Sequence, residues 1–193
     1  MMKMANRKTF SDRFSQAFLG DGPQTVQHDQ TVDPEAQAAA YNGYLQDEAV
    51  ELGDSFVQWV AAHKTIPIHA RAWGFVLGTF CTRAEYPGGV AAFDSIVAAA
   101  GEDLDLPRKE FDPPNIPEWT TEAMHHATQF AELSAGYVSL VRRQRSISDQ
   151  QAAYGIGRAW HNLRETFPQG GPVGFDVLAR EAADYFAQHK NGA

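Results

Sequence analysis

Ile66-Pro-Ile-His-Ala-Arg-Ala-Trp-Gly-Phe-Val-Leu-Gly-Thr-Phe-Cys-Thr82 is the densest apolar run of the chain, and it predicts a core helix. Within it, Ala70, Gly74 and Gly78 recur every fourth residue, so on a helix they form one smooth stripe. No long side chain on this stripe would keep a neighbouring backbone at a distance. We therefore expect another helix to cross closely there. The other sides carry large apolar residues, as in a helix surrounded by partners: Trp73, Phe75, Val76, Leu77 and Phe80.

The uninterrupted part of this run, from Ala72 to Thr82, is too short to cross a membrane. It is bounded by Arg71 and Arg83, whereas a membrane-spanning helix needs about 20 consecutive apolar residues. The segment therefore predicts the centre of a globular core and no transmembrane segment.

The overall composition is that of one globular domain. The chain has 193 residues, of which 44% are hydrophobic and 11% aromatic, and a disordered chain would not bury so much aromatic surface. The formal net charge of -8 disfavours binding to nucleic acid, because a phosphate-tracking surface needs clustered Lys and Arg. The single cysteine, Cys81, cannot form an internal disulfide, and we interpret it as a small buried apolar residue. Since the N-terminus also lacks the apolar segment of a secretory signal, we expect a cytoplasmic protein, prokaryotic or viral in origin.

Several other segments carry helix start, stop or periodicity signals. Asp33-Pro-Glu35 favours a helix start, and Ile66-Pro67 ends that helix because the residue before proline resists helical geometry. We expect Gly43 and Gly53 to bend or divide it. Ser148-Asp-Gln-Gln151 resembles a capping box at the start of a later helix. The predicted helices cover residues 33–66, 66–82, 90–100, 119–145, 148–167 and 173–186. The last of these has the i,i+4 spacing of ion pairs in Asp176, Arg180 and Asp184.

No segment combines β-branched residues with the alternation of a strand. The sequence therefore predicts an all-α fold: a single-domain helical bundle of about five to six helices with an N-terminal arm. The arm covers residues 1–32 and the helical domain residues 33–193. Within the domain, residues 102–118 form a Pro-rich acidic loop, which apolar residues are expected to pin to the core: Leu104, Leu106, Phe111 and Ile116.

The helix predicted for 119–145 has the clearest periodicity. Its apolar positions alternate steps of four and three, which predicts a single seam toward the core. The seam is made of Trp119, Ala123, His126, Phe130, Leu133, Tyr137 and Leu140.

The N-terminal arm carries a ridge of three phenylalanines. Phe10, Phe14 and Phe18 follow one another at steps of four, and the polar segment Gln24–Thr31 behind them is expected to be an extended tether. Such a ridge needs a surface to bind. It either folds back on its own domain, or docks into a partner or a second copy, or binds a membrane surface. The last option rests on the basic residues of the arm: Lys3, Arg7, Lys8 and Arg13.

One group of residues suggests a divalent metal. Glu122 and His125 have the Glu-x-x-His spacing of half a di-metal site in helical bundles, and His126 follows directly. Such sites need a second copy of the motif, and the sequence has none. His126 also lies on the predicted seam, where a histidine is more often a hydrogen-bonded core residue than a metal ligand.

Other chemistries have less support. Phosphate-binding and nucleophile motifs are missing, and the apolar neighbours of Cys81 should raise its pKa. A helix-turn-helix over residues 146–167 is disfavoured by the net charge and the turn residues. Five arginines lie in or near this segment: Arg142, Arg143, Arg145, Arg158 and Arg164. Favourable interaction with a helix dipole explains the first three of them.

The sequence thus favours a non-catalytic helical protein-interaction or regulatory protein, without a cofactor. Its acidic surface and the ridge of Phe10, Phe14 and Phe18 would bind a protein partner or a second copy. The alternative is a metal-dependent helical enzyme that uses Glu122, His125 and His126.

Overall fold

The computed structural model describes residues 34–106, 109–145 and 147–189, and their side chains other than those of 34–42, 45 and 138–145. The chain divides into two units, Met1–Gln37 and Ala38–Ala193, and the hydrophobic core belongs to the second unit. The ridge of Phe10, Phe14 and Phe18 lies outside the described residues.

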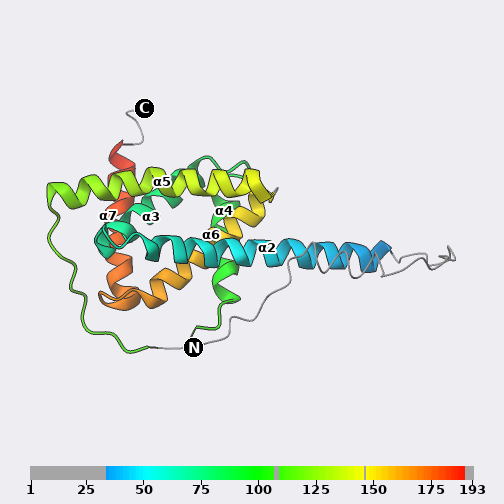
Figure 1. The fold of residues 1–193 in the computed structure, drawn as a ribbon, viewed down its shortest axis with the longest axis horizontal. Coiled ribbons are helices and arrows are strands. Elements are labelled where there is room, and N and C mark those ends of the chain that lie inside the picture. The colour runs from blue at the N-terminus through cyan, green and yellow to red at the C-terminus, as the bar shows by residue number, and fades with distance from the viewer. Residues whose placement is uncertain (1–33, 107–108, 146, 190–193) are drawn as a thin grey trace. The chain divides into compact units, whose positions relative to one another are not determined.

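The described residues form helices and irregular connections, without a strand. This confirms the predicted all-α bundle (Figure 1). The helices are α2 (Pro34–Ala62), α3 (Ile68–Ala84), α4 (Val90–Glu102), α5 (Thr121–Arg145), α6 (Asp149–Thr166) and α7 (Gly171–His189). In the part of the chain that is described, no helix is both long and apolar enough to cross a membrane.

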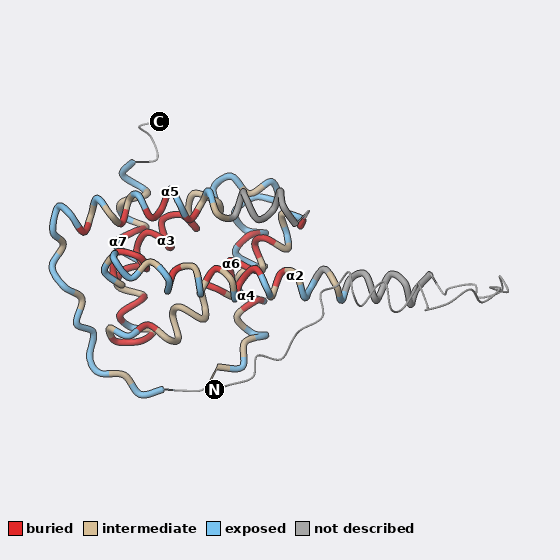
Figure 2. Tube along the Cα trace, in the orientation of Figure 1, coloured by how far each residue is buried: buried red, intermediate tan, exposed pale blue. Residues whose placement is uncertain are grey.

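Helix α3 is the centre of the domain, as the sequence predicts. It begins directly after Pro67, and every residue from His69 to Thr79 is buried. Figure 2 shows this continuous burial along α3. A helix can be buried on all sides because its backbone hydrogen bonds are satisfied within the helix itself.

The small-residue stripe of α3 lies against α5. A Cβ atom added at Gly74 would lie 2.5 Å from the carbonyl oxygen of Ala127, and one added at Gly78 would lie 2.8 Å from the Cβ of Ser134. Real Cβ atoms do not approach other atoms so closely, and the two backbones are in near contact. The predicted close crossing is confirmed, with α5 as the crossing helix.

The face that α5 turns to the core agrees with the predicted seam at Ala123, Phe130 and Tyr137 but not at Leu133. Leu133, a seam residue, is 52% exposed, whereas Ser134 is buried. The close approach of α3 explains the difference, because only small side chains fit between two backbones in near contact. Among the side chains of α5 that the structure describes, which do not include Leu140, the buried ones are Ala123, Ala127, Phe130, Ala131 and Ser134.

A second close crossing joins α2 and α6. A Cβ at Gly53 would lie 2.9 Å from the carbonyl oxygen of Gly155, and one at Gly155 would lie 2.9 Å from that of Ala49. Helix α2 is one continuous helix, so of the two expected effects, bending or division, Gly43 and Gly53 do not cause division. Gly53 serves instead to let α6 approach.

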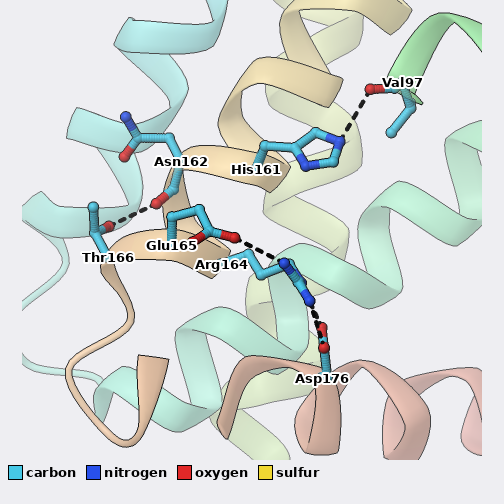
Figure 3. Close-up of polar contacts among 7 residues, drawn as sticks. All are labelled: Val97, His161, Asn162, Arg164, Glu165, Thr166 and Asp176. Carbon is cyan, nitrogen blue, oxygen red and sulfur yellow. Dashed lines mark hydrogen bonds and ion pairs between the residues drawn. The ribbon is translucent and has the colours of Figure 1, made fainter. Parts of the chain in front are cut away.

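Helix α6 also binds α4 and α7 by polar contacts. Ser148 and Gln151 form the predicted capping box at its start. Further along, His161 Nε2 donates to the carbonyl oxygen of Val97 in α4, at 3.1 Å. Arg164 donates two hydrogen bonds of 2.8 Å to the carboxylate of Asp176 in α7 (Figure 3). Asp176 was expected to pair within its own helix, but it pairs across helices because Nε and Nη2 of Arg164 form a fork that matches its two carboxylate oxygens.

Residues 109–120, which we call the strap, connect to α5 without regular secondary structure and can be followed as the green trace leading into that helix in Figure 1. Phe111 contacts Gly171, and Pro114 contacts Gly170 in the turn before α7. Both glycines have positive φ, of 55° and 100°. A side chain at either position would be strained and would also displace the strap. Phe111 therefore fixes the loop to the start of α7, and Ile116 packs against the core as predicted.

Candidate functional site

The proposed metal ligands lie in the first half of α5. Glu122 and His125 are exposed, His126 is half-buried, and the two imidazole centres are 6.1 Å apart. Among the residues that the structure describes, no three His, Cys, Asp or Glu side chains are grouped so as to hold a metal ion. The geometry thus adds nothing to the Glu-x-x-His spacing on which the metal hypothesis rests.

A cavity of about 260 Å³ lies at the C-terminal end of α3. Cys81 lines it and is half-buried, which corrects the expectation that this residue is fully buried. Burial, followed by the nearby carboxylate of Glu85, raises the pKa of the Cys81 thiol, as the sequence predicted. A protonated thiol is a weak nucleophile, so the cavity does not provide thiol catalysis at neutral pH. Its described lining consists of Cys81, Thr82, Glu85, Tyr86, Pro87, Phe93, Ala135, Asp149, Ala152 and Ala153.

A smaller, largely apolar groove of about 160 Å³ lies between α2, α3 and the end of α6. It offers little chemistry, because a hydroxyl is the one polar side-chain group in its described lining. The lining consists of Val57, Val60, Ala61, Ile68, Ala72, Leu163, Thr166, Phe167 and Pro168.

Arg71 has a structural role that the sequence did not suggest. It is 9% exposed, and its Nη1 donates to the carbonyl oxygens of Val60 at 2.6 Å and Ala61 at 3.1 Å. These carbonyls belong to the last turn of α2, which carries no basic residue of its own. A cation at a helix C-terminus satisfies free carbonyls and interacts well with the helix dipole. The guanidinium of Arg71 thus stabilises the end of α2 from the next helix.

A cluster of aromatic and titratable residues joins α3, the strap and α7. His69 is 5% exposed, and its ring meets that of Trp119 edge to face, with centroids 5.1 Å apart. The indole Nε1 of Trp119 donates to Glu181 Oε2 at 3.0 Å. Trp73 lies behind, 5.8 Å from the Trp119 ring and 5.1 Å from the ring of Tyr185. The end of the strap is therefore fixed to two helices at once.

The electrostatics of His69 are unusual within this cluster. Its Nε2 is buried without a hydrogen-bond partner. Burial lowers the pKa of His69 below 6.5, and the charge of Glu181 opposes that shift. The residue also lies in the first turn of α3, where the helix dipole disfavours a positive charge. No local sequence signal pairs His69 with Trp119 and Glu181, which lie 50 and 112 positions further along the chain.

Arginines and carboxylates of the described domain differ in their contacts. Three arginines are bound to groups of the domain itself: Arg71 to α2 carbonyls, Arg83 to Asp94 at 2.6 Å, and Arg164 to Asp176 at 2.8 Å. Many carboxylates of α2, the strap and α7 instead face solvent. The exposed carboxylates include Asp47, Asp54, Glu102, Asp105, Glu110, Asp112, Glu118 and Asp184.

Comparison with known proteins gives no further assignment, since no family model, no curated protein and no solved structure matches this chain. The function is therefore argued from the residues of the chain itself.

Proposed function

We propose that this chain is a non-catalytic protein-interaction or regulatory protein, which binds a basic protein partner through its acidic surface. The observation that supports the proposal is that arginines are bound within the domain while many carboxylates are exposed to solvent. Arg71 and Arg164 are bound within the domain, whereas carboxylates such as Asp54 and Asp112 face solvent. A field of one sign speeds encounter with an oppositely charged surface and excludes surfaces of like charge.

The strap is the part of this surface best suited to recognition. Glu110, Asp112 and Glu118 are exposed along it, while Phe111 and Ile116 fix it to the domain. A segment that is already ordered loses less conformational entropy on binding than a free loop does. The second element of the proposal is the ridge of Phe10, Phe14 and Phe18, which would supply the apolar contacts.

Binding to a purified partner tests the proposal. The full chain serves as bait in an extract of its native host, and the captured protein is then purified and titrated by calorimetry at two salt concentrations. We expect an affinity that falls with added salt and falls further in Glu110→Lys/Asp112→Lys. Lys64→Glu is the matched control, because it makes an exposed position more acidic and should preserve the affinity. An affinity that depends neither on salt nor on these carboxylates contradicts the proposal.

The role of the arm is tested separately. Deletion of residues 1–32 should leave helicity and cooperative melting nearly intact while abolishing partner binding or self-association, and Phe14→Asp should reproduce the binding defect. A large fall in melting temperature would instead place the ridge in the core of the domain. Elemental analysis of the purified chain addresses the metal-dependent alternative: stoichiometric iron, manganese or zinc that is lost in His125→Ala would overturn the non-catalytic proposal.

A further inference from the structure

His69 carries an energetic cost that packing alone does not explain. Its Nε2 atom is buried without a partner, and an unpaired buried polar group costs about 1–3 kcal/mol. A methyl-bearing or aromatic residue would fill the same place without this cost. Histidine differs from such residues in one respect, which is that it gains a proton in the physiological pH range.

We propose that His69, Trp119 and Glu181 form an acid-sensitive latch, which holds the C-terminal end of the strap on α3 and α7 at neutral pH and releases it on acidification. This proposal concerns regulation of the fold and does not depend on the identity of any partner.

In the neutral form the latch is closed by Trp119. Its indole donates to Glu181 on α7 and its ring covers the edge of His69 on α3. Neutral His69 makes no hydrogen bond through Nε2, so it does not compete for the carboxylate of Glu181. The strap then continues directly into α5, where Thr120 Oγ1 accepts from the N–H of Ala123 at 3.1 Å.

Uptake of a proton from solvent changes this balance. Both ring nitrogens of the imidazolium are donors, so Nε2 then requires an acceptor. Glu181, from α7, is the charged group of the described residues that acts on His69 through space. Arg71, on the same helix, is held by the carbonyls of α2. In the proposed latch the carboxylate of Glu181 moves toward Nε2, and this movement breaks its hydrogen bond with the indole of Trp119.

Release is confined to one end of the strap. Phe111 still lies against Gly171, and Ile116 still packs against the core, and neither contact involves a titratable group. Acidification thus frees Trp119 and its immediate neighbours while the bundle stays folded.

Nuclear magnetic resonance of the full chain between about pH 8 and pH 5 tests the latch. The indole N–H signal of Trp119 is identified by its loss in Trp119→Phe, and the ring signals of His69 by their loss in His69→Gln. We expect the Trp119 signal to shift and to exchange faster with water at the same midpoint at which His69 titrates. The indole signals of Trp59 and Trp160, whose rings contact other residues, should not shift at that midpoint.

Two variants separate the latch from general effects of acid. His69→Gln should abolish the pH-dependent shift of Trp119, whereas His161→Gln, at a half-buried histidine of α6, should retain it. The proposal is overturned if the Trp119 signal stays unchanged to about pH 5, if it shifts equally in His69→Gln, or if it is lost only together with the signals of all helices. If His69→Gln fails to fold, the His69 ring signals are assigned through nuclear Overhauser contacts with the neighbouring Trp119 ring, and the coincidence of midpoints in the unmodified chain is then decisive.

Discussion

Helix α3 and the strap are segments of similar length that meet the same core in opposite ways. Residues His69 to Thr79 are all buried, whereas no residue of the strap is buried and three are half-buried: Phe111, Ile116 and Trp119. The difference arises from the backbone. A helix satisfies its own N–H and C=O groups and can be enclosed, whereas an irregular segment must leave most of them to water. Helix α3 therefore joins the core through close contact of backbones, whereas the strap joins it through isolated apolar side chains.

The largest expected loss of stability comes from a larger side chain at the close contact between α3 and α5. Gly78→Leu places a side chain where a Cβ alone would lie 2.8 Å from the Cβ of Ser134 and 2.9 Å from the carbonyl oxygen of Ala131. Ordinary overpacking costs about 1–3 kcal/mol, and here a whole backbone must move, so we expect a loss above about 3 kcal/mol in the free energy of unfolding. Thermal melting measures it. Gly136→Leu on α5 is the control, because nothing lies within 4 Å of that position. An unchanged melting temperature in Gly78→Leu would refute the close crossing.

Removal of an apolar side chain from the strap should lower the free energy of unfolding by less than Gly78→Leu does. Phe111 is half-buried, and complete burial of a phenylalanine contributes about 1.5–3 kcal/mol, so Phe111→Ala should lower the free energy of unfolding by about 1–2 kcal/mol. Urea denaturation followed by circular dichroism gives the value, with the exposed Asn115→Ala as the control expected to stay within about 0.5 kcal/mol. A loss as large as that of Gly78→Leu would mean that the strap belongs to the core.

The pH dependence of the free energy of unfolding tests the buried histidine of α3 and a second histidine in α6. Burial lowers the pKa of His69 and of His161 below 6.5, so the unfolded chain binds more protons than the folded chain once the pH falls below that value. The free energy of unfolding should therefore decrease as the pH falls from 6.5 to the folded-state pKa values, and level off for these groups beyond them. Urea midpoints at a series of pH values measure the slope. In His69→Gln/His161→Gln the slope should be shallower, and an equal slope would show that other groups cause it.

The smallest expected change in the free energy of unfolding is an increase. Gly136 is an exposed residue within α5, away from the crossing, and a Cβ at this position meets no atom within 4 Å. Gly136→Ala should stabilise the fold by about 0.5–1 kcal/mol, because glycine loses more backbone entropy in a helix than alanine does. Differential scanning calorimetry would detect the rise. A fall would indicate that the surface of α5 at Gly136 is covered in solution.

Much of the fold was predictable because it depends on local signals. Helix starts such as the Ser148 capping box, and stops such as Pro67, are encoded within a few residues, and the four-residue spacing of Gly74 and Gly78 predicted a close crossing. The choice of contact face was not predictable in the same way. Apolar periodicity placed Leu133 inside, but the backbone of α3 leaves room only for smaller residues such as Ser134.

The polar contacts between helices were not predictable for a related reason. Arg71 lies about ten residues from the α2 carbonyls that it binds, and Trp119 lies 62 residues from Glu181. No periodicity or spacing rule connects such positions, since the fold itself brings them together. The predicted candidates Glu122 and His125 were found by spacing alone, and the structure places them on an exposed surface. The His69 cluster, without any sequence motif, was found by its unpaired nitrogen.

The contact of Gly74 and Gly78 with Ala127 and Ser134 also determines how this sequence can diverge. The space between the two backbones is fixed, so a methyl group gained on α3 must displace the backbone of α5. Gly78→Ala stays harmful even together with Ser134→Gly, because the carbonyl oxygen of Ala131 would still lie 2.9 Å from the added Cβ. Among descendants of this chain both glycines should therefore be retained, and their four-residue spacing would identify the crossing from sequences alone.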